Sequence, residues 1–492
     1  MPVLIEHIYE IVSAIVIVVL LGTGALVILA IGRRQRRERF FRRMDDLRQR
    51  YSPVIASILS EKVEYARGLE LLRGISGRDR DYVLETLCLE KKPTAQQVPI
   101  LRKLCEDLGL VKLWQARLSG KLSAISLRDA FGRPEGLIQR IGRLNFLLRA
   151  KAADNLGIVQ HHPSWPLLVK ALEDPHADVQ AVAVRSLAII QELECFGPLV
   201  ERLHHVVIKG TTPLSLRSIK TALVSFPLKY MSRLIPSLKH SHRRVRFLAT
   251  DIIREVVERQ AAWEEDFTLD AKNVEVELLE IFLEQTAFDE NPDVRARTAS
   301  VISYLADPRS TPVLLTLLED GKWFVRLHAV RALAKRKFLS QAPQIAQRLT
   351  DAHWMVREAA SRALLVFGRV GSDALIGHFL STEDRYSREQ IADEMQRAGL
   401  VPALLAQYAA ERESSEPVID MLVQMGKTSY LVWALENSPD LNVRKKFLIS
   451  YGREPDPQVQ AWISHVATTD VDPALRTLAG ELTRIPIRRG EG

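Results

Sequence analysis

The chain has 492 residues, of which 47% are apolar and 26% charged, a balance typical of folded proteins and not of disordered ones. Its net charge of +8 is concentrated in residues 33–50, where nine arginines face three acidic residues; residues 1–32 contribute −2, so residues 51–492 carry only +4. A remainder this close to neutral argues against a nucleic-acid-binding surface, and we expect no nucleic-acid partner.

Residues 11–32, "IVSAIVIVVLLGTGALVILAIG", form an uncharged run of 22 residues. About 20 helical residues span the hydrocarbon core of a bilayer, so this run predicts one transmembrane helix, preceded by a short extracytoplasmic segment, residues 1–10. Acidic residues before the run and basic residues after it are typical of an uncleaved anchor and not of a signal peptide. The positive-inside rule then predicts a single-pass protein of the inner (cytoplasmic) membrane, with residues 33–492 in the cytoplasm.

Residues 33–52 are a basic juxtamembrane segment. Its apolar residues recur at helical spacing with arginines on the other faces, so the segment could lie on anionic headgroups. The alternative is a solvated stalk whose charge only sets topology. The residues expected at the membrane surface are Arg33, Arg34, Arg36, Arg37 and Arg39.

Residues 53–135 show helical patterns, such as "VEYARGLELLRGI", without the motif that organises the rest of the chain. They could be degenerate repeats or a helical cap that shields the first repeat.

Residues 136–486 repeat one pattern, an aspartate followed five and six residues later by Val-Arg. "EDGKWFVRLHAVRAL" (319–333) and "TDAHWMVREAASRAL" (350–364) show it 31 residues apart (351 minus 320). Related Val-Arg or Leu-Arg pairs begin at residues 148, 245, 294, 443 and 475, and a Val-Gln pair begins at 179. Apolar residues follow at helical spacing and a second apolar run precedes each aspartate, so each unit reads as a helical hairpin that only stacked neighbours can bury. Residues 487–492 are read as a tail.

This motif resembles the repeats of the HEAT superfamily, including the short repeats of the phycobilin-lyase type, most clearly over residues 287–370. The resemblance implies an all-α fold: a right-handed α-solenoid of helical hairpins, here preceded by the single transmembrane helix. It also implies a hydrogen-bonded ladder between the aspartates and arginines of adjacent repeats. The residues implied are Asp289, Arg295, Asp320, Arg326, Asp351 and Arg357.

Two sets of repeat positions are candidates for binding a partner. Trp323 and Trp354 stand two residues before the valine, and they could form a docking strip or simply pack each turn against its own hairpin. Arg185, Arg331 and Arg362 stand six residues after it, where the second helix is expected to face the inner side of the array. Other repeats place acidic or neutral residues there, so a solvated face is the alternative to a basic stripe.

Chemistry-bearing motifs are weak. "MGKTSY" (425–430) lacks the first glycine of a phosphate-binding loop, and the histidine pairs have no cysteine or carboxylate at ligand spacing. Cys88, Cys105 and Cys195 are scattered, which fits a reducing compartment. We therefore predict no catalytic, metal-binding or cofactor-binding residue and no small-molecule substrate.

Together these patterns predict a membrane-anchored scaffold or adaptor whose repeats bind protein partners, with the bilayer contacted through residues 11–32. A regulatory subunit of an envelope or polysaccharide-synthesis assembly would have this form. The alternative, allowed by the repeat type, is an enzyme similar to bilin lyases that acts on a partner protein; the absence of a distinctive cysteine, histidine or acidic cluster disfavours it.

Overall fold

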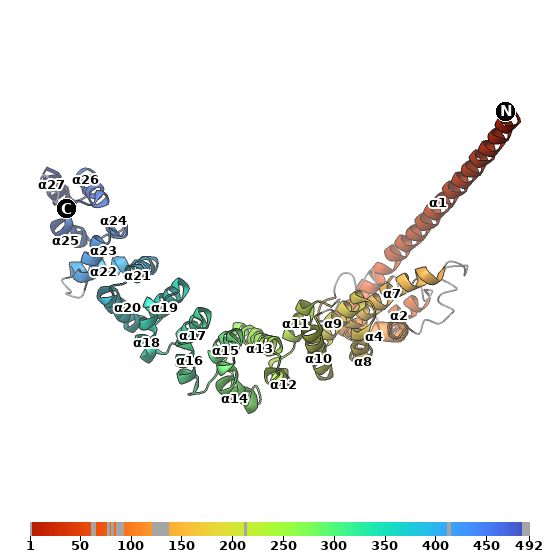
Figure 1. Ribbon diagram of the computed structural model, residues 1–492, viewed down its shortest axis with the longest axis horizontal. Coiled ribbons are helices and arrows are strands. Elements are labelled where there is room, and N and C mark those ends of the chain that lie inside the picture. The colour runs from red at the N-terminus through yellow and green to blue at the C-terminus, as the bar shows by residue number, and fades with distance from the viewer. Residues whose placement is uncertain are drawn as a thin grey trace. The chain divides into compact units, whose positions relative to one another are not determined.

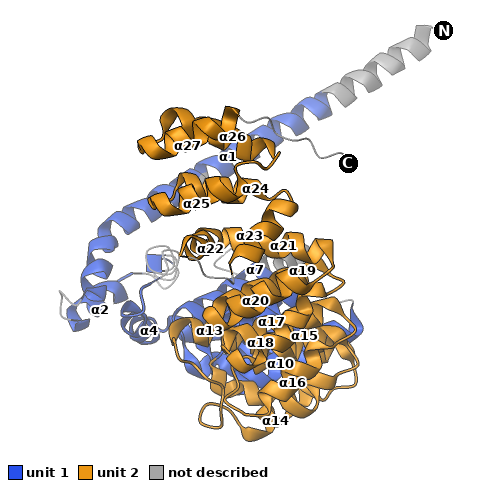
Figure 2. Ribbon diagram, turned by 90° about the vertical axis from the view of Figure 1, so that its left-hand side faces the viewer, with its two compact units in different colours: residues 1–226 blue, residues 227–492 orange. Residues whose placement is uncertain are grey.

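The structure, a computed structural model, describes residues 2–60, 65–75, 79, 83–84, 93–120, 137–210, 214–410 and 415–484, and of residues 2–16, 36–37 and 137–145 it describes the backbone only. The predictions for Cys88, for residues 121–135 and for the tail lie outside these ranges. The regular secondary structure of the described part is helical, apart from one isolated bridge between Leu269 and Leu305. The chain divides into two compact units, Met1–Phe226 and Pro227–Gly492 (Figure 2).

Unit 1 holds a long N-terminal helix and then shorter helices. They are α1 (Pro2–Leu59), α2 (Tyr65–Arg73), α4 (Gln97–Asp107), α5 (Leu110–Leu118), α7 (Leu137–Ile158), η2 (His162–Ser164), α8 (Trp165–Lys170), η3 (Ala171–Glu173), α9 (Ala177–Ile190), α10 (Leu193–Lys209) and α11 (Leu216–Val224).

Helix α1 runs without interruption through 58 residues and is long and apolar enough to cross a membrane. Between Ile17 and Ile31 its apolar side chains are exposed, for example Ile28 at 72%. Its other end contacts α2 and α4, and there Met44, Ile55 and Ile58 are buried. The same helix therefore carries an uncovered apolar stretch and a segment packed into unit 1.

Unit 2 is a succession of helical hairpins. Its helices are η4 (Leu228–Leu234), α12 (Ile235–Leu238), α13 (Arg243–Trp263), α14 (Val276–Glu284), η5 (Thr286–Phe288), α15 (Pro292–Ile302), α16 (Ser310–Leu318), α17 (Trp323–Lys335), η6 (Leu339–Gln341), α18 (Ala342–Ala346), η7 (Gln347–Thr350), α19 (Trp354–Val366), α20 (Arg369–Ser381), α21 (Arg385–Arg397), α22 (Leu400–Ala409), α23 (Glu416–Gln424), α24 (Thr428–Glu436), α25 (Leu441–Tyr451), α26 (Pro457–Thr469) and α27 (Pro473–Arg484).

The second helices of successive hairpins pack against one another. In Figure 1, α13, α15, α17 and α19 follow each other along one side of unit 2, while α14, α16 and α18 lie along the other. We call the layer made by α13, α15, α17, α19 and α21 the second-helix face. Each of its helices contacts the next, so a residue at a given repeat position lies near its equivalent in the next hairpin.

The core lies between the two layers. Val294, Val325 and Val356, the valines of the repeated motif, are fully buried, as are Ala329 and Leu333 one and two turns later on α17. Spacings of three and four residues place these side chains on one face of the helix. The amphipathic stripe expected from the sequence is confirmed.

Candidate binding surface

Each second helix follows a turn closed by the residue at the aspartate position of the motif. Asp320 Oδ1 accepts a hydrogen bond from the backbone N–H of Lys322 at 2.8 Å, and Asp351 Oδ1 accepts one from His353 at 2.9 Å. Where the aspartate is replaced, another short acceptor makes the same bond two residues ahead, as seen at His240, Thr382 and Ser438. The turn thus requires an acceptor but not a charge.

The arginine of the motif binds back to the turn that precedes its own helix. Arg326 Nη1 donates to the carbonyl oxygen of Asp320, six residues earlier, at 2.8 Å. The same six-residue bond is made by Gln180, Arg246, Arg295, Arg357, Arg388 and Arg476. This bond satisfies a carbonyl that the helix itself cannot reach, and it stays within one hairpin.

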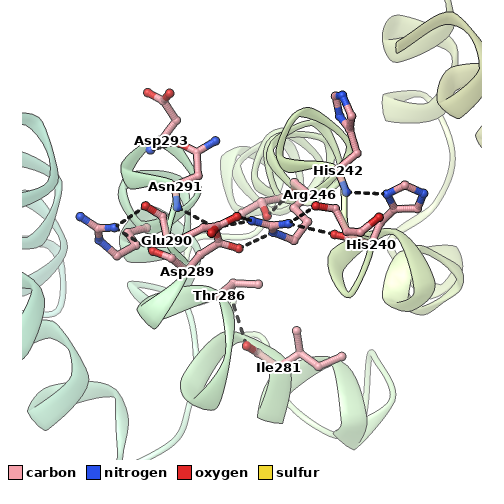
Figure 3. A network of polar contacts seen from close by, with 12 residues as sticks. His240, His242, Arg246, Ile281, Thr286, Asp289, Glu290, Asn291 and Asp293 are labelled. Carbon is pink, nitrogen blue, oxygen red and sulfur yellow. Dashed lines mark hydrogen bonds and ion pairs between the residues drawn. The ribbon is translucent and has the colours of Figure 1, made fainter. Parts of the chain in front are cut away.

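The rest of the guanidinium reaches the next hairpin. Arg326 Nε and Nη2 both donate to the Asp351 carboxylate at 2.6 Å, and Arg295 binds Asp320 in the same bidentate way at 2.6 and 3.0 Å. Arg149–Asp174 and Arg246–Asp289 (Figure 3) are bidentate pairs of the same kind, and Arg444 binds Asp470 through a single hydrogen bond at 2.6 Å. We call this series the Asp–Arg ladder.

The ladder carboxylates are nearly enclosed. The side chain of Asp351 is 3% exposed and that of Asp320 is 8% exposed. Burial alone would raise the pKa of each, but the hydrogen bonds from the arginines and from the turn N–H outweigh it, so both pKa values lie below the usual value. The bond to Asp351 likewise raises the pKa of Arg326. Both partners stay charged, which suits a charge-assisted, bidentate contact.

The ladder is interrupted after Arg357. Arg295, Arg326 and Arg149 each meet an aspartate 25 residues ahead, but the residue 25 ahead of Arg357 is Thr382. Arg357 Nε donates instead to the side chain of Gln390 at 3.2 Å, and Gln390 donates to the backbone of Trp354. The contact between α19 and α21 therefore lacks the ladder's paired charges.

The tryptophans two residues before the valine have different surroundings. The Trp323 ring stacks on His353 of the next hairpin, with centroids 3.8 Å apart and planes at 3°, and Phe146 stacks on His176 in the same way. For Trp354 the corresponding position holds Asp384, and the Trp354 side chain is 55% exposed. Trp354 and Tyr386, whose side chain is 73% exposed, both border a hollow of about 280 Å³. The ladder gap and the uncovered aromatic rings thus coincide.

The three arginines expected on the second-helix layer also differ. Arg185 pairs with Asp154 at 2.9 Å, the residue at the equivalent position one repeat earlier. Arg362 pairs with Glu358 at 2.7 Å and with the buried Glu394 at 3.4 Å. Within the described residues, Arg331 makes no hydrogen bond or ion pair. The set is not a continuous basic stripe.

Two further hollows adjoin Arg331. One of about 290 Å³ lies between α17 and α19, and the other, of about 220 Å³, is bordered by Ser300, Tyr304 and His328. His328 Nδ1 lies 3.0 Å from Ser300 Oγ, and burial, with the nearby charges of Arg297 and Arg331, lowers the pKa of His328 to about 4. The sequence alone does not identify these residues, because no motif includes them until the repeats are aligned with one another.

Residues Arg33, Arg34 and Arg39 lie on α1 directly after its exposed apolar stretch, and Arg34 pairs with Glu38 at 3.0 Å. The side chains of Arg36 and Arg37 lie outside the described part. Cys105 and Cys195 are buried. Among the described residues no three His, Cys, Asp or Glu side chains gather as a metal site would require.

Several known proteins are similar to this chain. Residues 278–365 match the family model for HEAT repeats. Escherichia coli YibA is 16% identical, with 54% of this chain and 95% of that chain covered and a TM-score of 0.31. The karyopherin Kap121p bound to RanGTP is 15% identical (88% and 56% covered, TM-score 0.38), and Kap121p bound to the extreme C-terminus of the protein phosphatase Cdc14p is 14% identical (83% and 51% covered, TM-score 0.40).

The chain spans about half the length of these karyopherin chains. A comparison with curated protein sequences found no significant match. The matched residues 278–365 comprise α14 to α19, the stretch in which the ladder and the valine core are most regular. This all-helical chain thus contains HEAT repeats.

Proposed function

We propose that this protein is a single-pass membrane protein whose HEAT-repeat array binds protein partners of a membrane-associated assembly, as a scaffold and not as an enzyme. The observation that carries the proposal is the group of exposed aromatic rings at the ladder gap. Trp354 and Tyr386 are large side chains that remain uncovered beside a hollow on the second-helix face. Tryptophan and tyrosine are the residues most enriched where protein partners bind.

The size of the hollows on the second-helix face supports a protein partner there; a larger hollow of about 550 Å³ lies apart from them, beside the loop after α13. The three on the second-helix face have volumes of about 220, 280 and 290 Å³, at or below the lower end for small-molecule sites, about 300–1,000 Å³. Hollows of this size accept single side chains of a partner. Charged residues around them, Glu358 and Arg362 among them, would form the polar rim of such an interface.

The apolar N-terminal half of α1 supports the membrane anchor. Burying side chains such as Leu21 and Ile28, now 70% and 72% exposed, would gain about 1.5–3 kcal/mol each. The arginines from Arg33 onward would lie at the cytoplasmic headgroups, where each basic residue contributes about 1 kcal/mol of attraction to anionic lipid. The N-terminus would then face out and the repeats would lie in the cytoplasm.

Site-specific photo-crosslinking tests the binding surface. Benzoylphenylalanine replaces Trp354 or Tyr386 on the second-helix face, or, as the control, Val370 of α20, which is 50% exposed. We expect the same identified protein adduct from positions 354 and 386 and none from 370. Adducts of equal yield at all three positions, or none at either aromatic position, would contradict the proposed surface.

Cysteine labelling tests the anchor and its orientation. In intact cells a membrane-impermeant maleimide should modify Leu4→Cys, while Lys272→Cys, in an exposed loop of unit 2, should react only after lysis. Deleting residues 2–32 should move the protein from the carbonate-resistant membrane fraction to the supernatant. Labelling of position 272 from outside would show that the orientation is wrong.

A further inference from the structure

Two cations on α17 stand out because their charge is not neutralised by a carboxylate contact. Arg331 and Lys335 lie one helical turn apart, and both border each of the two hollows beside α17. Arg331 has no hydrogen bond or ion pair within the part of the chain that the structure describes, and the Lys335 ammonium lies 3.2 Å from the centroid of the Tyr304 ring. Like charges four residues apart destabilise a helix, so this pair would gain from an anion placed between them.

The neighbouring charges are already satisfied. Arg362 and Arg397 bind Glu358 and Glu394, and the Asp251 carboxylate, one hairpin before Ser300, binds Arg254 and Arg297. This contrast makes Arg331 and Lys335 a local positive site beside charges that are already paired. The charge of Arg331 also acts on His328: burial and this charge both lower the pKa of His328.

The two hollows differ in chemistry. The one between α17 and α19 is lined by Met355, Ala359, Ala363 and Val366, and the Val366 side chain is 56% exposed. An apolar side chain of a partner would remove this surface from water. A carboxylate one or two residues away along an extended segment would then reach the two cations at the rim.

The site suits a single carboxylate better than a polyanion. Glu258 borders the hollow on one side of Arg331 and Glu358 borders the hollow on the other. Nucleic acid carries one negative charge per about 1.7 Å of duplex, so its next phosphates would meet these two carboxylates. A peptide can place one acidic residue between neutral neighbours.

Resting on the proposed function, we propose that Arg331 and Lys335 bind the acidic side chain of a partner's peptide segment, while an adjacent apolar residue of that segment enters the hollow between α17 and α19. The partner of this surface is therefore a segment in which glutamate or aspartate stands beside a large apolar residue.

A displayed library of random dodecapeptides, selected on the full chain in lipid nanodiscs, tests this. We expect the recovered peptides to share an acidic residue next to Leu, Ile, Met or Phe. Synthetic copies labelled with fluorescein should bind the double variant Arg331→Gln/Lys335→Gln about tenfold more weakly, since each exposed ion pair is worth up to about a factor of five. Replacing the peptide's acid by its amide should cause a similar loss and leave little further effect of the variant.

The matched control removes two exposed positive charges elsewhere in unit 2, Lys322 in the turn before α17 and Arg369 at the start of α20. Lys322→Gln/Arg369→Gln should bind the peptides as the native protein does and keep the native melting temperature. The Arg331/Lys335 variant should also stay folded, with at most the small loss of the Lys335–Tyr304 contact. Peptides that bind equally to the Arg331/Lys335 variant overturn this inference and leave the proposed function standing. A selection that yields no peptide at all counts against both. If a fluorescein-labelled thymidine dodecamer binds more tightly than the peptides through the same two cations, the site takes nucleic acid and the peptide proposal is wrong.

Discussion

The turn before α19 and the turn before α21 are built alike and connected differently. At Asp351 one side chain both closes its own turn and accepts two hydrogen bonds from Arg326 of the preceding hairpin. At Thr382 the hydroxyl closes the turn, but it offers no carboxylate to Arg357. The aspartate of the motif therefore has two separable roles. It accepts the hydrogen bond that closes the turn, which both turns keep, and it binds the arginine of the preceding hairpin, which only Asp351 does.

The difference shows what the ladder adds to the array. Shape within a hairpin depends on the turn acceptor and on the six-residue bond of the arginine, and both are present at α21, where Arg388 binds the Thr382 carbonyl. Contact between hairpins depends on the carboxylate. At the same junction the side chains of Trp354 and Tyr386 are exposed, and Asp384 stands where His353 covers Trp323 in the preceding hairpin.

The largest expected effect comes from removing Arg326, whose ladder contact is intact, compared with removing Arg357, the arginine at the gap. Arg326→Ala leaves the nearly buried Asp351 carboxylate without its partner and should lower the free energy of unfolding by about 3 kcal/mol. Arg357→Ala loses only neutral contacts and should cost about 1 kcal/mol. Hydrogen exchange should localise the first loss to residues 290–370. Equal losses for the two variants would mean that the ladder charges contribute nothing beyond the turns.

Acid should weaken the regular region through His328. Its folded-state pKa of about 4 lies below the usual histidine value of 6.5, so between these values the unfolded chain binds a proton that the folded chain does not. Stability is therefore full above pH 6.5 and falls as the pH drops toward 4, by up to about 3 kcal/mol. His328→Gln should flatten urea midpoints across this window. The lowered pKa values of Asp320 and Asp351 add a further loss below about pH 4, which this variant should keep.

The two equivalent tryptophans should respond differently. Trp323→Ala removes a ring stacked on His353 and should destabilise the protein by about 1 kcal/mol or more. Trp354→Ala removes a half-exposed ring whose stacked contact, with the adjacent His353, has centroids 6.3 Å apart, and should change stability by less than about 0.5 kcal/mol. It should reduce the photo-crosslinking yield from position 386. A binding defect in Trp323→Ala alone would reverse the assignment of the two residues.

The smallest expected effect is a gain. Thr382→Asp places a carboxylate 25 residues after Arg357, the spacing of Arg149–Asp174, Arg295–Asp320 and Arg326–Asp351, and should stabilise the array by about 0.5–1 kcal/mol. Thr382→Asn keeps the turn acceptor without the charge and serves as the control. The prediction fails if Asp and Asn give the same melting temperature.

Much of this architecture could be predicted from the sequence. The buried valines and the helical hairpins follow from residues that recur at fixed spacing. Asp320 accepts a hydrogen bond from the Lys322 N–H and Arg326 donates to Asp351, but the structural role that the resemblance implied for them stays a prediction. The motif residues do not mark the hairpin at Thr382–Arg388, since serine replaces the valine and threonine replaces the aspartate. The repeat spacing does mark it, because Thr382 lies 31 residues after Asp351.

The candidate site was harder to predict from the sequence than the fold. Whether a tryptophan is covered depends on the residue 30 positions ahead, His353 in one hairpin and Asp384 in the next, and that requires the register of both. The ion pairs of Arg185 with Asp154 and of Arg362 with Glu394 depend in the same way on side chains from neighbouring helices. So does the absence of a partner for Arg331 among the described residues. A contact between two repeats depends on the residues of both repeats. A pattern found within one repeat therefore does not predict it.

The unbroken course of α1 has a mechanical consequence. Under the proposed anchoring, the span would end near Gly32, and Met44 is already buried in unit 1, so 11 helical residues, about 16 Å, separate lipid from protein. A hydrogen-bonded helix this short does not act as a swivel. Any tilt of the span in the bilayer would therefore change how α1 packs against α2 and α4. Since tilt depends on membrane thickness, a change in the thickness or tension of the membrane would alter the packing of the first unit.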